Sequence, residues 1–351
     1  MSQKIAVILF NLGGPDKLKS IKPFLFNFFM DENIISAPKP IRYFIAKWIA
    51  HTRSKGAALE AYSKIGGASP ILENTMLQRQ ALERSLNIGF DGEIKCFVSM
   101  RYWHPQSDQI AREVAEYNPD KVILVPLYPQ FSTTTTYSSF QDWNKTCKKI
   151  GFKPDTTSLC CYALDDGFVK PSADLVNYSY KKTQRENPNT PIRLLFSAHG
   201  LPGKIIEDGD PYQWQCQESA RLIAEATGLE NLDWEICYQS RVGRLKWIEP
   251  STDQALEKAA RDGVGVLIYP HAFVSEHVET LVEIEDEYRE KSNDLGIPFF
   301  ERVPTVSTHP QFITGLKSLI LDMLDKSGTV SYKGAPICPP EFKNCCQRKA
   351  L

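Results

Sequence analysis

Short apolar runs alternate along the chain with longer segments of mixed apolar and polar residues. Runs of this kind, bounded by turn residues, predict buried strands. The predicted strands are 5–10, 94–100, 121–127, 192–197, 234–239, 264–269 and 298–302. Strands separated by helices of about 10 to 15 residues predict parallel sheets with right-handed crossovers.

The intervening segments predict helices that divide the chain into two similar blocks. These helices lie near 73–86, 107–117, 140–150, 212–227, 252–262, 276–292 and 310–325. The pattern predicts an α/β protein with two Rossmann-like, doubly wound domains, parallel sheets and an active-site cleft between them. We expect an N-terminal domain at 1–155 and a second domain at 156–309, joined near 155–190. A C-terminal helix at 310–330 and a cysteine-containing tail at 331–351 follow.

Composition and charge exclude several classes of protein. Of the 351 residues 42% are hydrophobic and 24% are charged, as in globular proteins, and the formal net charge of −1 gives no general attraction to nucleic acid. No apolar run approaches the roughly 18 residues of a membrane span. The first apolar run ends at Asn11, which indicates a strand and no signal peptide. The sequence therefore predicts a cytoplasmic protein, or one bound peripherally to the inner face of a membrane.

Unusual polar and aromatic residues directly follow four of the predicted strands. His199 and His271 follow strands of the second block, and Arg101 and Tyr128 follow strands of the first. Open parallel sheets bind ligands at the carboxyl ends of their strands. A single histidine at a strand end is as often structural as functional, so a second signal is needed.

That second signal is a dense acidic segment from Glu276 to Glu290. Glu279, Glu283 and Glu287 recur every four residues and therefore form one stripe along the predicted helix. Like charges at this spacing oppose each other by a few tenths of a kcal/mol. One interpretation is an acidic surface helix. The other is a path of oxygen ligands for a divalent cation, and a π-bulge would bring more of these carboxylates onto one face.

The nine cysteines are unevenly distributed. Cys96, Cys147, Cys216 and Cys237 lie in predicted strands and helices, where we expect them to be packing residues. An adjacent pair and a terminal group remain, namely Cys160, Cys161, Cys338, Cys345 and Cys346. In a reducing compartment this pattern favours a metal or cluster site over disulfides.

Several motifs occur together in one order along the chain. They include Leu12-Gly13-Gly14-Pro15, Ile65-Gly66-Gly67-Ala68-Ser69-Pro70, Arg101-Tyr102-Trp103-His104-Pro105, Tyr128-Pro129-Gln130-Phe131-Ser132, Ser197-Ala198-His199-Gly200-Leu201-Pro202, Tyr238-Gln239-Ser240-Arg241-Val242-Gly243, Trp247 and Ser275-Glu276-His277-Val278-Glu279-Thr280. The glycine-rich turns lack the spacing of a dinucleotide fingerprint or a P-loop. The colinear set resembles the ferrochelatase family over roughly residues 4 to 325.

The resemblance implies a lyase that inserts Fe²⁺ into protoporphyrin IX and releases two protons, the terminal step of haem synthesis. It implies porphyrin and ferrous iron as substrates. His199 and Glu279 resemble the central catalytic and metal-binding pair, and His277, Glu276 and Glu283 resemble neighbours that support this pair or deliver the metal. The porphyrin-binding positions implied by the resemblance are Leu12, Arg101, Tyr102, Tyr128 and Trp247.

The chemistry of metal insertion explains these residue types. Imidazole and carboxylate groups bind Fe²⁺ without trapping it as thiolates do. Two pyrrole protons need a base, so His199 must be neutral when the porphyrin arrives. The sequence leaves open which of His199 and Glu279 accepts protons and which binds the metal.

One departure from the family pattern concerns the cysteines. Animal members carry a cluster cysteine in the loop after the Tyr-Pro-Gln motif, where this chain has Phe131 to Thr135 without cysteine. Some bacterial members use a later cysteine with a C-terminal group. The resemblance therefore implies a [2Fe–2S] cluster whose ligands are Cys160 or Cys161, Cys338, Cys345 and Cys346. The alternative is a disordered tail with unpaired thiols.

Two rival functions and one surface stay open at this point. A related chelatase would act on coproporphyrin or insert cobalt, and a non-catalytic protein would only bind a metal or tetrapyrrole. The segment Phe24–Met30 is rich in phenylalanine. It is either a core helix or an exposed lip that contacts a membrane peripherally. The oligomeric state cannot be read from the sequence.

Overall fold

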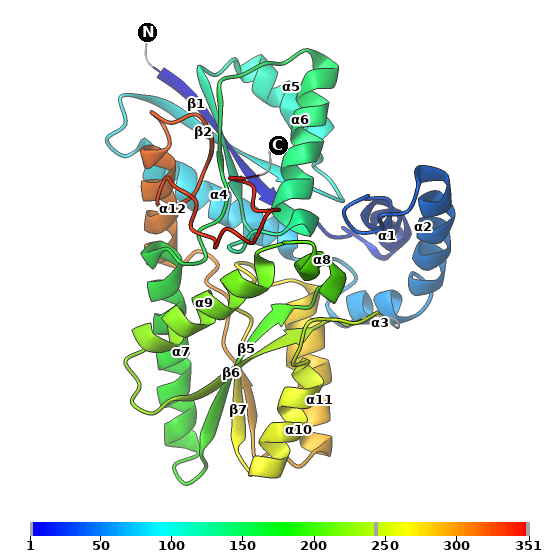
Figure 1. Ribbon diagram of the computed structural model, residues 1–351, viewed down its shortest axis with the longest axis vertical. Coiled ribbons are helices and arrows are strands. Elements are labelled where there is room, and N and C mark those ends of the chain that lie inside the picture. Colours follow the sequence, from blue (N-terminus) through cyan, green and yellow to red (C-terminus); the bar gives the residue numbers. More distant parts are fainter. Residues whose placement is uncertain (1–2, 242–244, 349–351) are drawn as a thin grey trace. The chain divides into compact units, whose positions relative to one another are not determined.

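The computed structural model describes residues 3–241 and 245–348, which form two compact units (Figure 1). Unit 1 comprises residues 1–161, 316–337 and 346–351, and unit 2 comprises residues 162–315 and 338–345. Val242 and Gly243 of the sequence motif lie outside the described residues.

Unit 1 is built on a five-stranded parallel sheet in the order β2-β1-β3-β4-β9. The strands are β1 (Gln3–Asn11), β2 (Gly92–Met100), β3 (Lys121–Pro126), β4 (Thr156–Leu159) and β9 (Gly328–Val330). In β1, the central apolar run from Ile5 to Phe10 is at most 1% exposed. Continuous apolar sequence is expected for a parallel strand that is covered on both faces.

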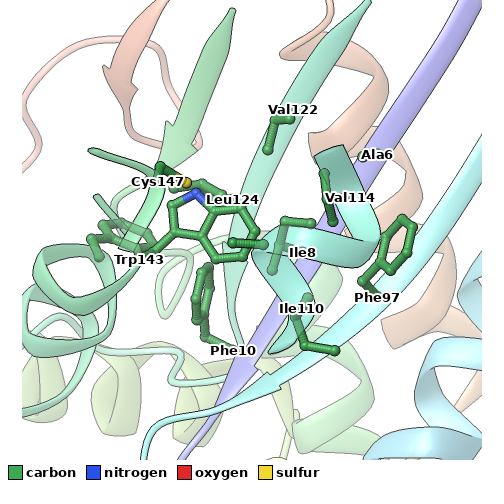
Figure 2. Packing of buried hydrophobic residues seen from close by; sticks show 12 residues of the cluster. Ala6, Ile8, Phe10, Phe97, Ile110, Val114, Val122, Leu124, Trp143 and Cys147 are labelled. Atoms are coloured by element: carbon green, nitrogen blue, oxygen red, sulfur yellow. The ribbon is translucent and has the colours of Figure 1, made fainter. Parts of the chain in front are cut away.

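Helices of unit 1 cover this sheet and extend beyond it. They are η1 (Leu18–Ser20), α1 (Ile21–Phe29), α2 (Lys39–Arg53), α3 (Ala57–Lys64), α4 (Ile71–Asn87), α5 (Ser107–Tyr117), the π-helix η2 (Thr133–Tyr137) and α6 (Ser138–Ile150). In the core, the Phe10 ring packs edge-to-face with Phe140 and Trp143, with ring centroids 5.6 and 5.9 Å apart. Figure 2 shows Phe10 and Trp143 in this cluster. These contacts pack α6 against β1, an interior strand of the sheet.

Unit 2 contains a four-stranded parallel sheet in the order β6-β5-β7-β8. Its strands are β5 (Ile192–His199), β6 (Asp233–Gln239), β7 (Gly265–Tyr269) and β8 (Phe300–Arg302). Its helices are α7 (Asp166–Glu186), α8 (Gly203–Glu207), α9 (Tyr212–Ala226), α10 (Thr252–Asp262), the π-helix η3 (Glu279–Glu287) and α11 (Tyr288–Asp294). Helix α12 (Pro310–Asp322) begins in unit 2 and ends in unit 1.

The two parallel α/β sheets confirm the predicted fold class, but the region near 155–190 differs from the expectation. It was predicted as a connection, whereas it contains β4 and the 21-residue helix α7. Strand β4 is short, contains Thr and Ser, and pairs with β9. The residues near β4 in the sequence give no indication of this pairing. Among the described residues no helix is long and apolar enough to cross a membrane.

Candidate functional site

His199 ends strand β5 at the carboxyl edge of the unit 2 sheet. Its Nδ1 lies 2.7 Å from the carbonyl oxygen of Gly200, and its own carbonyl accepts a 3.0 Å hydrogen bond from the Tyr212 hydroxyl. Because a carbonyl only accepts, Nδ1 carries the proton in the neutral imidazole. The lone pair therefore lies on Nε2 of His199, for which no partner is found within 3–241 and 245–348.

The turn after His199 requires a residue without a side chain. A Cβ on Gly200 would lie 2.8 Å from the Gln239 carbonyl oxygen and 3.4 Å from Cε3 of Trp247. The backbone of Trp247 also forms an isolated bridge with Pro202. The structure therefore places Trp247, one of the predicted porphyrin-binding residues, directly beside the turn that follows His199.

Within the acidic segment, Glu279–Glu287 form the π-helix η3, the kind of departure from α-helical geometry considered for this stretch. At its start, Nε2 of His277 lies 3.2 Å from a carboxylate oxygen of Glu279. His277 is buried, and its Nδ1 has no hydrogen-bond partner in the described parts of the chain. Along the stripe, Glu279 and Glu283 are half-buried while Glu287 is exposed. The stripe thus runs from a sheltered end to solvent.

Glu283 joins the acidic helix to the same sheet edge as His199. Its carboxylate accepts hydrogen bonds from the Gln239 amide at 3.0 Å, the Ser240 backbone N–H at 2.6 Å, the Ser240 hydroxyl and the Tyr288 hydroxyl at 3.2 Å. Gln239 pairs in register with His199 across β5 and β6. The carboxylate of Glu283 is therefore held by four donors, and η3 is anchored at the end of the strand next to His199.

Glu276 is held by an arginine that sequence reasoning missed. Nη1 of Arg302 lies 3.0 Å from both carboxylate oxygens of Glu276, which also accepts from the Thr305 N–H at 2.9 Å. The same guanidinium donates through Nε to Glu285 at 2.9 Å. Burial opposes the charged carboxylate, but Arg302 and the hydrogen bonds outweigh it and lower the pKa of Glu276. The available signal was the position of Arg302 at the end of a predicted strand.

In unit 1, Arg101 and Tyr102 converge on a second missed residue, Asp31. Arg101 pairs with Asp31 at 3.0 Å and donates to the Ser138 hydroxyl at 2.7 Å, and the Tyr102 hydroxyl donates to Asp31 at 2.7 Å. Tyr102 is fully buried, which raises its pKa well above the ordinary value. Arg101 is thus fixed by buried partners, whereas Leu12 and Tyr128 are half-buried.

His271, also at the carboxyl edge of the unit 2 sheet, has a structural environment. Its side chain is 0% exposed, and Nε2 lies 3.2 Å from the Cys216 carbonyl oxygen. Burial lowers the pKa of His271 to about 4, so the ring is neutral near pH 7. The ring packs edge-on against Phe196, with centroids 5.6 Å apart. His271 is therefore a packing residue in the core of unit 2.

The cysteines predicted to bind a cluster are all buried, and two of them are joined. Cys160 and Cys346 form a disulfide with a Cα–Cα distance of 6.1 Å, although the sequence favoured a metal site over disulfides. Cys160 follows β4, and its N–H donates to the carbonyl of Val330 at the end of β9. The disulfide to Cys346 therefore attaches the last residues of the chain beside the β4–β9 pair. The amide of Gln215 donates to Cys338 Sγ at 3.1 Å. Among the described residues no group of three His, Cys, Asp or Glu side chains has metal-site geometry.

Comparison with known proteins gives one consistent family. The family model described as Ferrochelatase matches residues 4–324. A ferrochelatase of Caulobacter vibrioides is 48% identical over 347 residues, covering 98% of each chain, and one of Pelagibacter ubique is 43% identical over 344 residues, covering 97% of this chain and 98% of its own. Among solved structures, SirB from Bacillus subtilis with Fe³⁺ covers 92% of this chain and 96% of its own, with a TM-score of 0.53 at 10% identity. The last likeness concerns the fold alone.

Proposed function

Because the chain belongs to the ferrochelatase family of porphyrin metal chelatases, we propose that His199 and Glu279 carry out its reaction, the insertion of Fe²⁺ into a porphyrin. Two pyrrole N–H protons leave as the metal enters, so the site needs a proton acceptor and a metal ligand. Protoporphyrin IX is the proposed porphyrin. The alternatives are coproporphyrin as substrate, cobalt as metal and, least supported, binding without turnover.

His199 is the proposed proton acceptor. The observation that carries this assignment is the 2.7 Å contact between its Nδ1 and the Gly200 carbonyl, which leaves the lone pair on Nε2. A neutral imidazole whose Nε2 lone pair has no partner among the described residues can accept a proton directly. Trp247, which lies beside Gly200, is the proposed flat apolar surface for the macrocycle.

Glu279 and His277 are the proposed groups that hand over the metal. Their 3.2 Å contact combines one carboxylate and one imidazole, which suit Fe²⁺, and a pair of ligands holds a metal less tightly than a complete coordination sphere. Glu283 and Glu276 are engaged by four donors and by Arg302 respectively, and we assign them supporting roles. Of the porphyrin-binding candidates, buried Tyr102 acts through Asp31 and Arg101, whereas Leu12 and Tyr128 retain exposed surface.

Porphyrin fluorescence tests this function directly. Anaerobic addition of Fe²⁺ to protoporphyrin IX should remove porphyrin emission at a rate proportional to protein concentration, because the iron complex does not fluoresce. Parallel reactions with coproporphyrin and with Co²⁺ rank the alternatives by kcat/KM. A single loss of emission equal to the amount of protein, without further turnover, would identify a binding protein and contradict the proposal.

We further propose that Cys338, Cys345 and Cys346 bind a [2Fe–2S] cluster together with Cys160 or Cys161. The support is that the fold brings Cys160 and Cys346 together, with Cα atoms 6.1 Å apart, that Cys345 is covalently next to Cys346, and that all these cysteines are buried. Thiolates are the cluster ligands, so the cluster forms only when the Cys160–Cys346 disulfide is reduced. The cluster would fasten a tail whose Gly- and Pro-rich composition gives little burial of its own.

Anaerobic purification with iron and sulfide supplied tests the cluster. The protein should be red-brown with about two irons per chain, and Cys338→Ser should remove the colour. The matched control Cys147→Ser, a buried cysteine of α6, should keep it. Colourless protein would eliminate the cluster, and so would equal iron in both variants.

A peripheral contact with the cytoplasmic face of a membrane is the final part of the proposal. In the predicted lip, Phe24 and Leu25 are only 6% and 8% exposed, so α2 carries the better-exposed apolar surface. Phe44 and Trp48, one turn apart on that helix, are 70% and 69% exposed. Trp48→Ser should weaken sedimentation with anionic vesicles. Tyr178→Ser, equally exposed at 69% in unit 2, should not, and equal losses would contradict the assignment.

A further inference from the structure

A cavity of about 660 Å³ lies in unit 1. His199 and the acidic helix belong to unit 2. The cavity is lined by the segment that follows α1, the first turn of α2, Arg101 and one face of α6. Its volume lies within the range of small-molecule sites, about 300 to 1,000 Å³. Of the residues given roles above, Arg101 and its partner Asp31 lie on its wall.

Three cationic side chains in this cavity have incomplete partners. Lys39 and Lys145 are exposed, and no carboxylate or other acceptor is found for either ammonium within the described residues. Arg42 is 9% exposed, and its buried Nε has no hydrogen-bond partner. Its Nη1 donates to the carbonyls of Ile35 and Ala37, and Nη2 lies 3.8 Å from Glu32. A largely buried guanidinium with a missing acceptor is costly without a nearby anion.

The carboxylates of the cavity neutralise its cations only in part, because Asp31, Glu32 and Asp142 face the four cations Lys39, Arg42, Arg101 and Lys145. Asp31 and Asp142 both face Arg101, at 3.0 and 3.7 Å, and Asp31 also accepts from Tyr102 and Ser138. Glu32 is the remaining acidic residue of the lining, and its contact with Arg42 is long.

The first turn of α2 adds to the positive potential. This 15-residue helix starts at Lys39 after Pro38, with no side-chain cap and no acidic residue in the first turn. Pro38 and Pro40 carry no N–H, so the contribution of this helix start comes mainly from the helix dipole, which favours an anion there.

We propose that this cavity binds a small molecule carrying oxyanion groups, phosphate or carboxylate, at Lys39, Arg42 and Lys145. Such a ligand completes the partners of the buried guanidinium and of two lysines on different helices. The cavity has room for more than one oxyanion, so a ligand with several anionic groups fits better than a monovalent anion. It is a site in addition to the groups proposed for metal insertion.

Isothermal titration of the full chain with pyrophosphate and, separately, with citrate tests this site. At least one probe should bind saturably at one site per chain in about 0.1 M chloride, where weak surface attraction is screened. Reversing both surface lysines, Lys39→Glu with Lys145→Glu, should weaken binding by about tenfold or more. The matched control, Lys148→Glu with Lys149→Glu on the same helix α6, changes net charge equally and should stay within about twofold of the parent.

Further measurements distinguish this site from the porphyrin site. Arg42→Gln should abolish binding, and the lysine variants carry the test if that variant fails to fold. Saturating porphyrin, whose own carboxylates are the competing source of oxyanions, should leave pyrophosphate binding unchanged, and so should His199→Ala. The proposal is overturned by absence of saturable binding for both probes, by equal weakening in both lysine pairs, or by displacement of the probe by porphyrin.

Discussion

Arg302 is the residue whose replacement should most disturb the start of the acidic helix. Its side chain is 12% exposed and that of Glu276 is 22% exposed, and Nη1 of Arg302 lies 3.0 Å from both carboxylate oxygens. Arg302→Met leaves the Glu276 carboxylate without its cation. Breaking a buried pair by removing one partner costs about 3 to 5 kcal/mol. Because Glu285, the second partner, is 37% exposed and regains water, we expect the lower end, about 3 kcal/mol.

Hydrogen exchange measures this loss locally, which matters because the two units of the chain need not unfold together. A reduction of about 3 kcal/mol should speed exchange of the η3 amides roughly hundredfold. Arg289→Met is the matched control. Arg289 also pairs with Glu285, but its side chain is 35% exposed, so its loss should cost about 1 kcal/mol or less.

A double variant then separates charge from packing. With Glu276→Gln added, no unpaired charge remains, and about 2 kcal/mol of the loss from Arg302→Met should be recovered. Two results would refute the reasoning: equal exchange rates in Arg302→Met and Arg289→Met, or a double variant whose loss is the sum of the single losses.

Three further predictions follow from other parts of the chain. Glu279→Gln should lower kcat for metal insertion far more than Glu287→Gln, because Glu279 is half-buried beside His277 whereas Glu287 is exposed; equal kcat values would reduce the stripe to a charged surface. Asp31 is buried, yet Arg101 and its hydrogen bonds hold its pKa below the ordinary value of 3.8, so its carboxylate stabilises the fold above that pH. The free energy of unfolding of Asp31→Asn should therefore lie below that of the parent by a constant amount from about pH 5 to 8, and urea titrations should show the gap narrowing below about pH 4. Trp143→Ala, in the core of unit 1 (Figure 2), should lower the free energy of unfolding by about 3 to 5 kcal/mol, and a loss below about 1 kcal/mol would contradict its packing role.

The alternation of strands and helices was predictable where each element carried its own pattern. The run from Ile5 to Phe10 is buried on both faces and forms β1, an interior strand between β2 and β3. By contrast, β4 and β9 are short and of mixed polarity, and they pair across 170 residues of chain, so their identity depends on a partner that no local window contains. The same holds for the return of Cys346 to Cys160.

The candidate site divides in a similar way. His199 and the acidic stripe could be recognised because strand ends and i, i+4 spacing are local features. Two supporting residues were missed: Arg302, which holds Glu276, and Asp31, which holds Arg101. Ion pairs between residues 26 or 70 positions apart leave no periodic pattern in the sequence. Which nitrogen of His199 is free also depended on the position of the Gly200 carbonyl, which only the three-dimensional structure supplies.

The central claim is that Nε2 of His199 accepts the pyrrole protons while other residues bind the porphyrin. Porphyrin affinity and metal insertion, measured on the same preparation of His199→Ala, test it most directly. The account predicts porphyrin binding within about threefold of the parent and a kcat at least about a hundredfold lower, as expected when a general base is removed. Turnover within about tenfold of the parent rate would make His199 a structural residue and would contradict the account.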